Sequence, residues 1–385
     1  MQNFEYYNPV KIFFGEGEIS KLSQAIAADK KVLMLYGGGS IKKNGVYDQV
    51  AKALANHSVL EFAGIEPNPE YETCMKAVGF IKENNIDFVL AVGGGSVIDA
   101  AKFIVAAAKF EGEPWDILAK GATINDALDF GTVLTIPATG SEMNAGSVVS
   151  RREFDKKLAF MNEKVFPKFS VLDPAVTYTL PARQVANGVV DAFVHVMEQY
   201  LTYPQNAPLQ DRFAEGILQT LVEEGEKIIQ NPDDYDVRAN IMWSATLALN
   251  SLISRGVAMD WSTHMIGHEL TTFYGLDHAQ TLAIILPSMM DFKRDKKGDK
   301  IAQYAERVWG ASSSLSKDEK IDVAITKTIE FFEKVGNHTK LKGYGFGSEH
   351  FAKVVASLEA NGMTALGEHG DISLDDVQKI LEMSL

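Results

Sequence analysis

The chain has 385 residues, of which 46% are hydrophobic and 23% are charged, a composition typical of a globular protein of about two domains. Its 51 acidic and 37 basic side chains give a formal net charge of −14 at pH 7, which disfavours nucleic acids and anionic membranes as partners. The one cysteine, Cys74, excludes an intrachain disulfide and a zinc site that needs two or more cysteines of this chain.

The same features indicate where the protein resides. No stretch approaches about 18 consecutive apolar residues, so no membrane span is expected. Residues 1–18 lack the basic and apolar regions of a signal peptide. A single thiol also fits a reducing compartment. We therefore predict a cytoplasmic protein, and its charge is no argument against a small-molecule substrate.

The first part of the chain alternates short apolar runs with helical patterns. The apolar runs cover residues 32–36, 59–62, 88–92 and 133–136, and the helical patterns cover 44–55, a segment from about 70, and 97–109. Short strands without a polar face are expected in parallel sheets, whose two faces are both covered by helices. We therefore predict a parallel α/β domain over residues 1–181, with an antiparallel α+β domain as the alternative.

The second part of the chain is dominated by helical periodicity, and strand signals nearly vanish. Helices are expected over residues 182–201, 207–230, 235–255, 259–273, 279–293, 298–309, 316–335, 349–360 and 374–384. The sequence therefore predicts a second, all-helical domain over residues 182–385.

A glycine-rich segment follows the third predicted strand. Gly93, Gly94, Gly95 and Ser96 precede a helix, where glycines allow a phosphate to approach the backbone and the helix start offers N–H donors. The spacing differs from G-x-G-x-x-G, so a tight turn without a ligand is the alternative. Asp99, in the first helical turn, fits a ligand contact and a dipole-complementing role equally well.

A second glycine segment, at residues 37–40, follows the first predicted strand. NAD-binding folds often place a carboxylate near this point to accept the ribose 2′-hydroxyl, but none follows Tyr36. Lys42 and Lys43 instead offer donors for a 2′-phosphate, which favours NADP, although solvated lysines are the commoner case. Thr135 and Thr139 add hydroxyls at the carboxyl end of the fourth predicted strand, where α/β sheets bind ligands; a loop with a helix cap is the equal alternative.

Acidic and histidine side chains recur at helical spacing in the second domain. Asp191 and His195 lie four residues apart on an apolar helix, His264 and His268 form a second such pair, and His278 follows. Each pair alone is more simply explained as a hydrogen-bonded core pair than as a metal site. Together they favour a site for zinc or ferrous iron rather than magnesium or calcium. The spacing leaves open whether His264 and His268 chelate the same ion.

With these motifs the whole chain resembles the iron-containing (group III) alcohol dehydrogenase family. The resemblance begins at residues 8–15 (NPVKIFFG) and continues to the last helices. Residues 36–40 (YGGGS), 261–264 (WSTH) and 277–280 (DHAQ) look most like the NADPH-dependent butanol dehydrogenase and aldehyde reductase branch. The resemblance implies a Rossmann-like domain, an all-α domain of the dehydroquinate synthase-like architecture, an active site between them, and a homodimer.

The resemblance also implies roles for individual residues. Asp191, His195, His264 and His278 match the metal ligands, and His268 matches a histidine that lies near the metal without binding it. We expect His268 to act as a catalytic proton relay. Lys157 matches a lysine near the cofactor ribose. The matched cofactor-binding positions are Gly37, Gly38, Gly39, Ser40, Asn68, Gly94, Gly95, Ser96, Asp99, Thr135, Thr139 and Lys157.

The chain departs from the family pattern at three places. Asp277-His278-Ala279 stands where many members have Pro-His-Gly, the loop at 137–142 is shortened, and Gly37 stands where NAD-dependent members carry Asp. These departures fit the NADPH branch. They leave the choice between zinc and iron open.

The sequence thus predicts an NADP(H)- and metal-dependent alcohol dehydrogenase or aldehyde reductase. It would transfer hydride between NADPH and small aliphatic aldehydes. An NAD-linked polyol dehydrogenase of the glycerol type is the nearest alternative. A lyase of the dehydroquinate synthase type and a non-enzymatic nucleotide- or metal-binding module are more distant ones.

Overall fold

The computed structural model describes residues 1–154 and 156–385, and the chain forms two compact units. One unit comprises Tyr7–Leu180, and the other comprises Pro181–Leu385 together with Met1–Tyr6. The N-terminal segment is attached to the helical unit, because the backbone N–H of Gln2 donates to the carbonyl of Gly256 at 2.8 Å. The first six residues, which we expected in the first domain, therefore belong to the helical unit.

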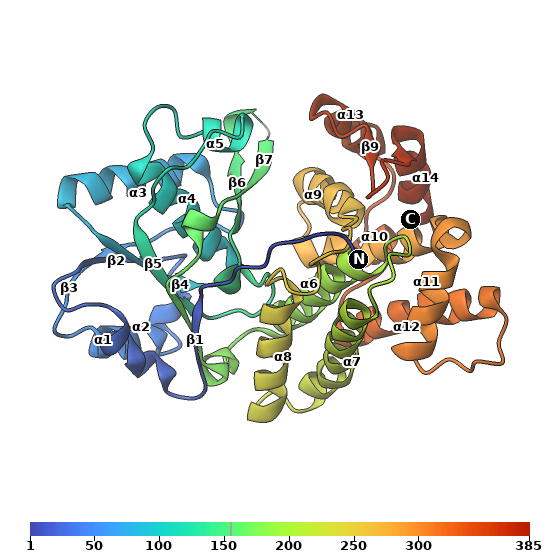
Figure 1. The fold of residues 1–385 in the computed structure, drawn as a ribbon, viewed down its shortest axis with the longest axis horizontal. Coiled ribbons are helices and arrows are strands. Elements are labelled where there is room, and N and C mark those ends of the chain that lie inside the picture. Colours follow the sequence, from blue (N-terminus) through green and yellow to red (C-terminus); the bar gives the residue numbers. More distant parts are fainter. Residues whose placement is uncertain (155) are drawn as a thin grey trace. The chain divides into compact units, whose positions relative to one another are not determined.

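The first unit is built on a six-stranded sheet in which every neighbouring pair is parallel (Figure 1). In spatial order the strands are β1 (Lys11–Phe14), β8 (Phe169–Leu172), β5 (Asp129–Leu134), β4 (Phe88–Gly93), β2 (Lys31–Tyr36) and β3 (Ser58–Phe62). All six residues of β4 are buried, as expected for a central strand covered on both faces. The predicted parallel α/β class is therefore confirmed.

Helices connect the parallel strands of this sheet. They are α1 (Leu22–Ala25), α2 (Val46–Ala53), α3 (Tyr71–Asn84), α4 (Gly95–Lys109) and α5 (Asp116–Ala119). Single 3-10 turns lie at η1 (Glu18–Lys21), η2 (Ser40–Lys42), η3 (Ser141–Met143), η4 (Arg152–Phe154), η5 (Glu163–Val165) and η6 (Pro174–Thr177). Of the helices of this unit, α4 is the most deeply buried, with ten of its fifteen residues buried.

Four strands of this unit were not predicted from the sequence. Two are the short strands β1 and β8, with four residues each. The other two, β6 (Gly146–Arg151) and β7 (Lys156–Met161), form a separate antiparallel pair. Apolar and polar residues do not alternate along either sequence (GSVVSR and KKLAFM), so neither shows the period of a strand.

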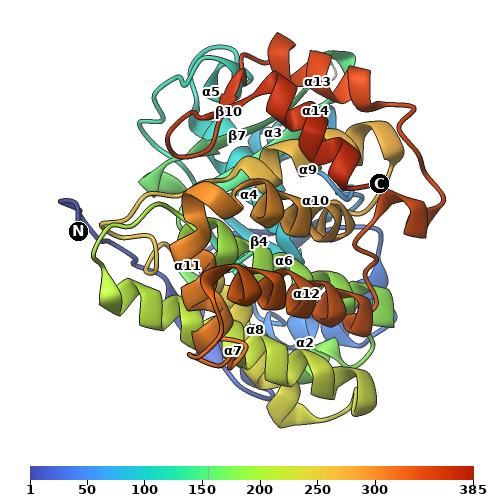
Figure 2. The same ribbon diagram turned by 90° about the vertical axis from the view of Figure 1, so that its right-hand side faces the viewer.

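The second unit is helical around one large apolar core (Figure 1). Its helices are α6 (Ala182–Tyr200), α7 (Pro208–Gln230), α8 (Tyr235–Ala248), α9 (Ser262–Tyr274), α10 (His278–Phe292), α11 (Arg294–Arg307), α12 (Lys317–Val335), α13 (Phe351–Ala360) and α14 (Leu374–Met383), with a 3-10 turn at η7 (Leu341–Tyr344). Figure 2 shows α13 beside α14, and α13 also packs on α9. The predicted helical class of this unit is confirmed.

Three details of the helical unit differ from the sequence prediction. The helix expected over 298–309 begins four residues earlier, since α11 covers Arg294–Arg307. The helix expected over 235–255 ends at Ala248, since Ser251 has a left-handed backbone (φ 73°) that cannot continue a helix. A short antiparallel pair, β9 (Ala365–Leu366) and β10 (Ile372–Ser373), also interrupts the helices. Within the described ranges, no helix is long and apolar enough to cross a membrane.

Candidate metal centre and cofactor-binding loops

Helix α6 positions the first two candidate ligands. Asp191 and His195 lie one turn apart within its buried stretch, with His195 Nε2 3.7 Å from Asp191 Oδ1. Asp191 is 4% exposed, and its Oδ1 has no hydrogen-bond partner among the described residues. A buried carboxylate oxygen in that state costs free energy unless a cation or donor satisfies it.

Helices α9 and α10 bring the remaining histidines to the same place. Potential ligand atoms of Asp191, His195 and His264 all lie within 4.8 Å of one another, and all three side chains are buried. His278, the first residue of α10, has its Nε2 3.7 Å from Asp191 Oδ1. One carboxylate with two or three imidazoles is a typical donor set for zinc or ferrous iron, so the residues fit a divalent cation.

His268 lies beside this cluster but outside its tightest group. Its ring centroid is 4.9 Å from that of His278 and 6.3 Å from that of His264. The group whose ligand atoms all lie within 4.8 Å of one another comprises Asp191, His195 and His264, without His268. The structure thus brings all five predicted residues together, with His268 at the border of the cluster.

Asp277, the residue before His278, stabilises the start of α10. Its backbone N–H donates to Gln280 Oε1 at 2.9 Å, and its carboxylate accepts from Asn187 Nδ2 at 2.8 Å. Since Asn187 belongs to α6, Asp277 ties the start of α10 to the helix that carries Asp191 and His195. It thereby steadies the neighbouring His278.

A buried glutamate that we did not predict also touches the cluster. Glu198, one turn after His195 on α6, has its Oε1 2.8 Å from the backbone nitrogen of His264 and 3.1 Å from His264 Nδ1. Burial and the nearby Asp260 raise the pKa of Glu198, whereas the backbone N–H of His264 lowers it. The signal in the sequence was present, because Asp191, His195 and Glu198 follow one another on a single helix face.

In the α/β unit, side chains that follow β5 pack closely against the turn between β4 and α4. A Cβ added to Gly95 would lie 2.4 Å from Thr139 Oγ1, and one added to Gly94 would lie 3.1 Å from the Ile136 side chain. The contact at Gly95 is closer than a Cβ can come without displacing Thr139, whereas at Gly94 the Ile136 side chain would have to move only slightly. The segment that follows β5 therefore rests directly on the start of α4, which brings Thr139 to the predicted phosphate loop.

Three predicted cofactor-binding residues from separate segments meet nearby. The backbone N–H of Asn68 donates to Ser96 Oγ at 3.3 Å, and Lys157 Nζ donates to Asn68 Oδ1 at 2.8 Å. Asn68 has a left-handed backbone (φ 58°), which asparagine tolerates better than most residues. This backbone conformation has an energetic cost, and residues in such conformations are common at binding sites.

Asp99 has a different environment from the other predicted cofactor residues. Its Oδ1 accepts from Ser141 Oγ at 2.6 Å, and its Oδ2 accepts from the backbone N–H of Val148 at 3.0 Å. The adjacent Lys102 is fully buried, and burial lowers its pKa to about 8. Both carboxylate oxygens accept from protein donors, so Asp99 ties the segment from 141 to 148 to α4.

The loop after β2 carries the remaining predicted positions, 37–40. A Cβ on Gly38 or Gly39 would meet nothing within 4 Å, and Gly39 has a left-handed φ of 92°. Thr135, by contrast, is buried, and its backbone N–H donates to the carbonyl of Gly93 at 3.0 Å.

Lys42, at the end of η2, forms an ion pair with Glu61 on β3 at 3.1 Å, and nearly half of the Lys42 side chain is exposed. Hydrogen bonds with Tyr36 and Glu61 raise the pKa of Lys42, which keeps it cationic.

Comparison with known proteins adds independent information. Residues 9–174 match the iron-containing alcohol dehydrogenase family, and residues 185–385 match the C-terminal region of the Fe-containing alcohol dehydrogenase family. The NADPH-dependent aldehyde reductase YqhD of Escherichia coli strain K12 is 56% identical over 385 residues, which is 99% of each chain. A probable NADH-dependent butanol dehydrogenase of Bacillus subtilis strain 168 is 43% identical over the full length of both chains.

Solved structures agree with these matches. The crystal structure of NADH-dependent butanol dehydrogenase A from Thermotoga maritima has a TM-score of 0.94 and 37% sequence identity to this chain. That alignment covers 100% of this chain and 99% of the other, so both units of the fold are shared.

Proposed function

Because the chain belongs to the iron-containing alcohol dehydrogenase family, we propose that it is an NADP(H)- and metal-dependent alcohol dehydrogenase that reduces small aliphatic aldehydes. The observation that carries the proposal is the buried group of Asp191, His195 and His264 in a chain that matches an aldehyde reductase from end to end. This relationship does not favour the glycerol-type polyol alternative.

Each unit has its own task in the proposed reaction. When bound, the divalent cation supplies Lewis-acid polarisation of the aldehyde oxygen, and NADPH supplies the hydride. Asp191, His195, His264 and His278 would hold the cation. The glycine segments at 37–40 and 93–95, with Asn68, Ser96, Thr139 and Lys157, would hold the dinucleotide. His268 would deliver the proton that the product oxygen requires.

We also propose that NADPH is preferred to NADH. Support comes from the absence of a carboxylate directly after Tyr36, from the room around Gly38, and from the cationic Lys42 nearby. The relatives include both NADPH- and NADH-dependent enzymes, so this preference is a property of the individual chain.

We also propose the oligomeric state, the location and the class of metal. The family resemblance favours a homodimer, which light scattering of the purified protein would check. A single buried thiol, Cys74, favours the reducing environment of the cytoplasm. The donor set suits zinc and ferrous iron alike, so the metal is to be identified by elemental analysis of protein purified without air.

One experiment tests the core of the proposal. NADPH and NADH oxidation are followed with butyraldehyde, before chelation, after it, and with zinc or ferrous iron added back. We expect activity that favours NADPH, disappears on chelation and returns with metal. Asp191→Ala and His264→Ala should lose metal and turnover together. Full turnover in the metal-free protein, or loss of turnover with full metal retention in both variants, would contradict the proposed centre.

A further inference from the structure

The contacts of Glu198 are more specific than burial alone requires. Its Oε1 accepts from the backbone N–H of His264 at 2.8 Å and also lies 3.1 Å from Nδ1 of the same residue. The side chain is 3% exposed, and that of His264 is 8% exposed. One oxygen of Glu198 therefore fixes both the main chain and the ring orientation of His264.

We infer that Glu198 is a positioning residue that orients His264 toward the metal. This inference rests on the metal centre proposed above. A cation bound through Nε2 requires the proton of the imidazole to reside on Nδ1, and Nδ1 then needs an acceptor. Histidine ligands commonly donate this second N–H to a carboxylate, which fixes the ring and raises its basicity. Glu198 Oε1 is the acceptor that the geometry supplies.

Glu198 also links two of the helices that carry ligands. The backbone carbonyl of Glu198 on α6 accepts from the backbone N–H of Asp260, just before α9, at 2.9 Å. The intervening Trp261 has a left-handed backbone (φ 64°), a strained state that persists only when its surroundings hold it. The start of α9, and with it His264, is thus attached to α6 on both sides of Trp261.

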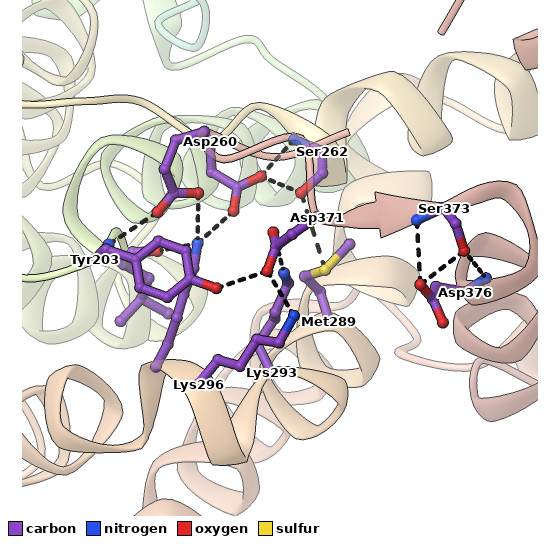
Figure 3. Close-up of polar contacts among 12 residues, drawn as sticks. Tyr203, Asp260, Ser262, Met289, Lys293, Lys296, Asp371, Ser373 and Asp376 are labelled. Carbon is purple, nitrogen blue, oxygen red and sulfur yellow. Dashed lines mark hydrogen bonds and ion pairs between the residues drawn. The ribbon is translucent and has the colours of Figure 1, made fainter. Parts of the chain in front are cut away.

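A buried ionic group secures the other side of this attachment (Figure 3). The carboxylate of Asp260 accepts from the backbone N–H of Ser262 at 2.9 Å and from Lys297 Nζ at 2.5 Å. Lys297, on α11, also binds Glu368 at 2.9 Å, and all three charged side chains are at most 6% exposed. Asp260 is thereby held at one place, so the distance between the α9 start and Glu198 is constrained.

The test compares two replacements of Glu198 with a matched control. Glu198→Met keeps the side-chain volume but removes the acceptor, whereas Glu198→Gln keeps an acceptor oxygen. Glu215→Gln removes another buried carboxylate of the same unit, one that contacts Tyr200 and Arg307 instead. The apo form of each full-length protein is titrated with Co²⁺ against a chelator, and the visible absorption of the bound Co²⁺ is recorded.

We expect Glu198→Met to weaken Co²⁺ binding about 10- to 100-fold and to change the absorption bands. Glu198→Gln should retain more affinity than Glu198→Met, and Glu215→Gln should match the wild type. If packing were the only role of Glu198, the Met and Gln variants would behave alike. Wild-type affinity and spectrum in both Glu198 variants would overturn the inference.

The outcomes also separate this inference from the proposed function. A wild-type protein that binds no Co²⁺ would overturn the metal centre itself, together with the inference. A wild type that binds Co²⁺ while the Glu198 variants do the same would overturn only the role of Glu198. If Glu198→Met does not fold, an unchanged affinity and spectrum in Glu198→Gln alone would contradict the inference.

Discussion

At the scale of single residues, the candidate centre depends on polar groups placed inside an apolar helix. Asp191 and His195 are surrounded by Val189, Val190 and Phe193, all fully buried. Such a position is costly for a carboxylate unless a partner compensates it. The cost explains why helical spacing of Asp and His on an apolar helix is informative, whereas the same spacing on a solvated helix is not.

His268 provides the first prediction at this scale. Its ring lies 4.9 Å from that of His278, beside the cluster but outside its tightest group. We expect His268→Ala to lower kcat by about 10²- to 10⁴-fold while the protein retains its metal, because only proton delivery is removed. Elemental analysis and the pH profile of kcat test this. Full activity at every pH, or parallel loss of metal, would disprove the assignment.

Lys42 provides the second residue-scale prediction. Glu61 and the rings of Tyr36 and Tyr47 surround its ammonium group, which holds it near the loop at 37–40. We expect Lys42→Ala to raise KM for NADPH about 3- to 10-fold, since one partly exposed contact to the 2′-phosphate is lost. KM for NADH should stay unchanged. The control is Lys52→Ala, on α2, and an equal effect of Lys42→Ala on both coenzymes would exclude 2′-phosphate recognition.

At the scale of elements, the start of α4 is where close packing and cofactor binding coincide. Gly95→Ala would place a methyl group 2.4 Å from Thr139 Oγ1, so Thr139 and its loop must shift. Overpacking of this kind costs about 1–3 kcal/mol, and we expect NADPH to bind at least about 10-fold more weakly. Fluorescence titration of NADPH measures the change.

The matched control for this element is Gly79→Ala on α3. Nothing lies within 4 Å of a Cβ at Gly79, so NADPH binding should not change. The helix should gain about 0.5–1 kcal/mol of stability, because alanine is favoured over glycine in a helix interior. NADPH affinity that is equal in both variants would show that the contact between Gly95 and Thr139 does not shape the binding loop.

At the scale of the whole molecule, ion pairs join distant segments of the helical unit. Asp371, next to β10, accepts from Lys293 Nζ at 2.7 Å, from Lys296 Nζ at 2.8 Å and from the Tyr203 hydroxyl at 2.7 Å (Figure 3). Although burial acts in the opposite direction, these hydrogen bonds lower the pKa of Asp371 below its ordinary value of 3.8. The ionised carboxylate therefore stabilises the folded state.

Asp371→Asn should reduce the free energy of unfolding by about 2–3 kcal/mol at pH 7. A depressed carboxylate pKa gives stability that is complete above the unfolded-state value and is lost as the pH falls through the folded-state value. The difference from wild type should thus stay constant from pH 7 to about 5 and shrink below about 4. Urea unfolding curves measure it. Asp322→Asn, which removes an exposed pair with Arg294, should cost less than about 1 kcal/mol, and an equal cost in both variants would contradict the argument.

Local patterns predicted most of the elements that carry the candidate site. The fully apolar run at 88–92 indicated a central strand, and the four-residue spacings of Asp191 with His195 and of His264 with His268 indicated shared helix faces. These signals are readable because side-chain direction repeats within a few residues along a helix or strand. Strands β1 and β8 were missed, because periodicity alone does not decide whether so short an apolar run is a strand.

The sequence by itself determined the two-part architecture, the glycine turns after β2 and β4, and the residue types that suit a metal. The tertiary structure alone decided which distant groups meet. Glu198 reaches His264 across 66 positions, and Lys297 reaches Asp260 and Glu368 across 37 and 71 positions. No local period predicts such pairs. They form only when separate helices pack together, because a buried charge is costly unless an opposite charge or a hydrogen bond compensates it.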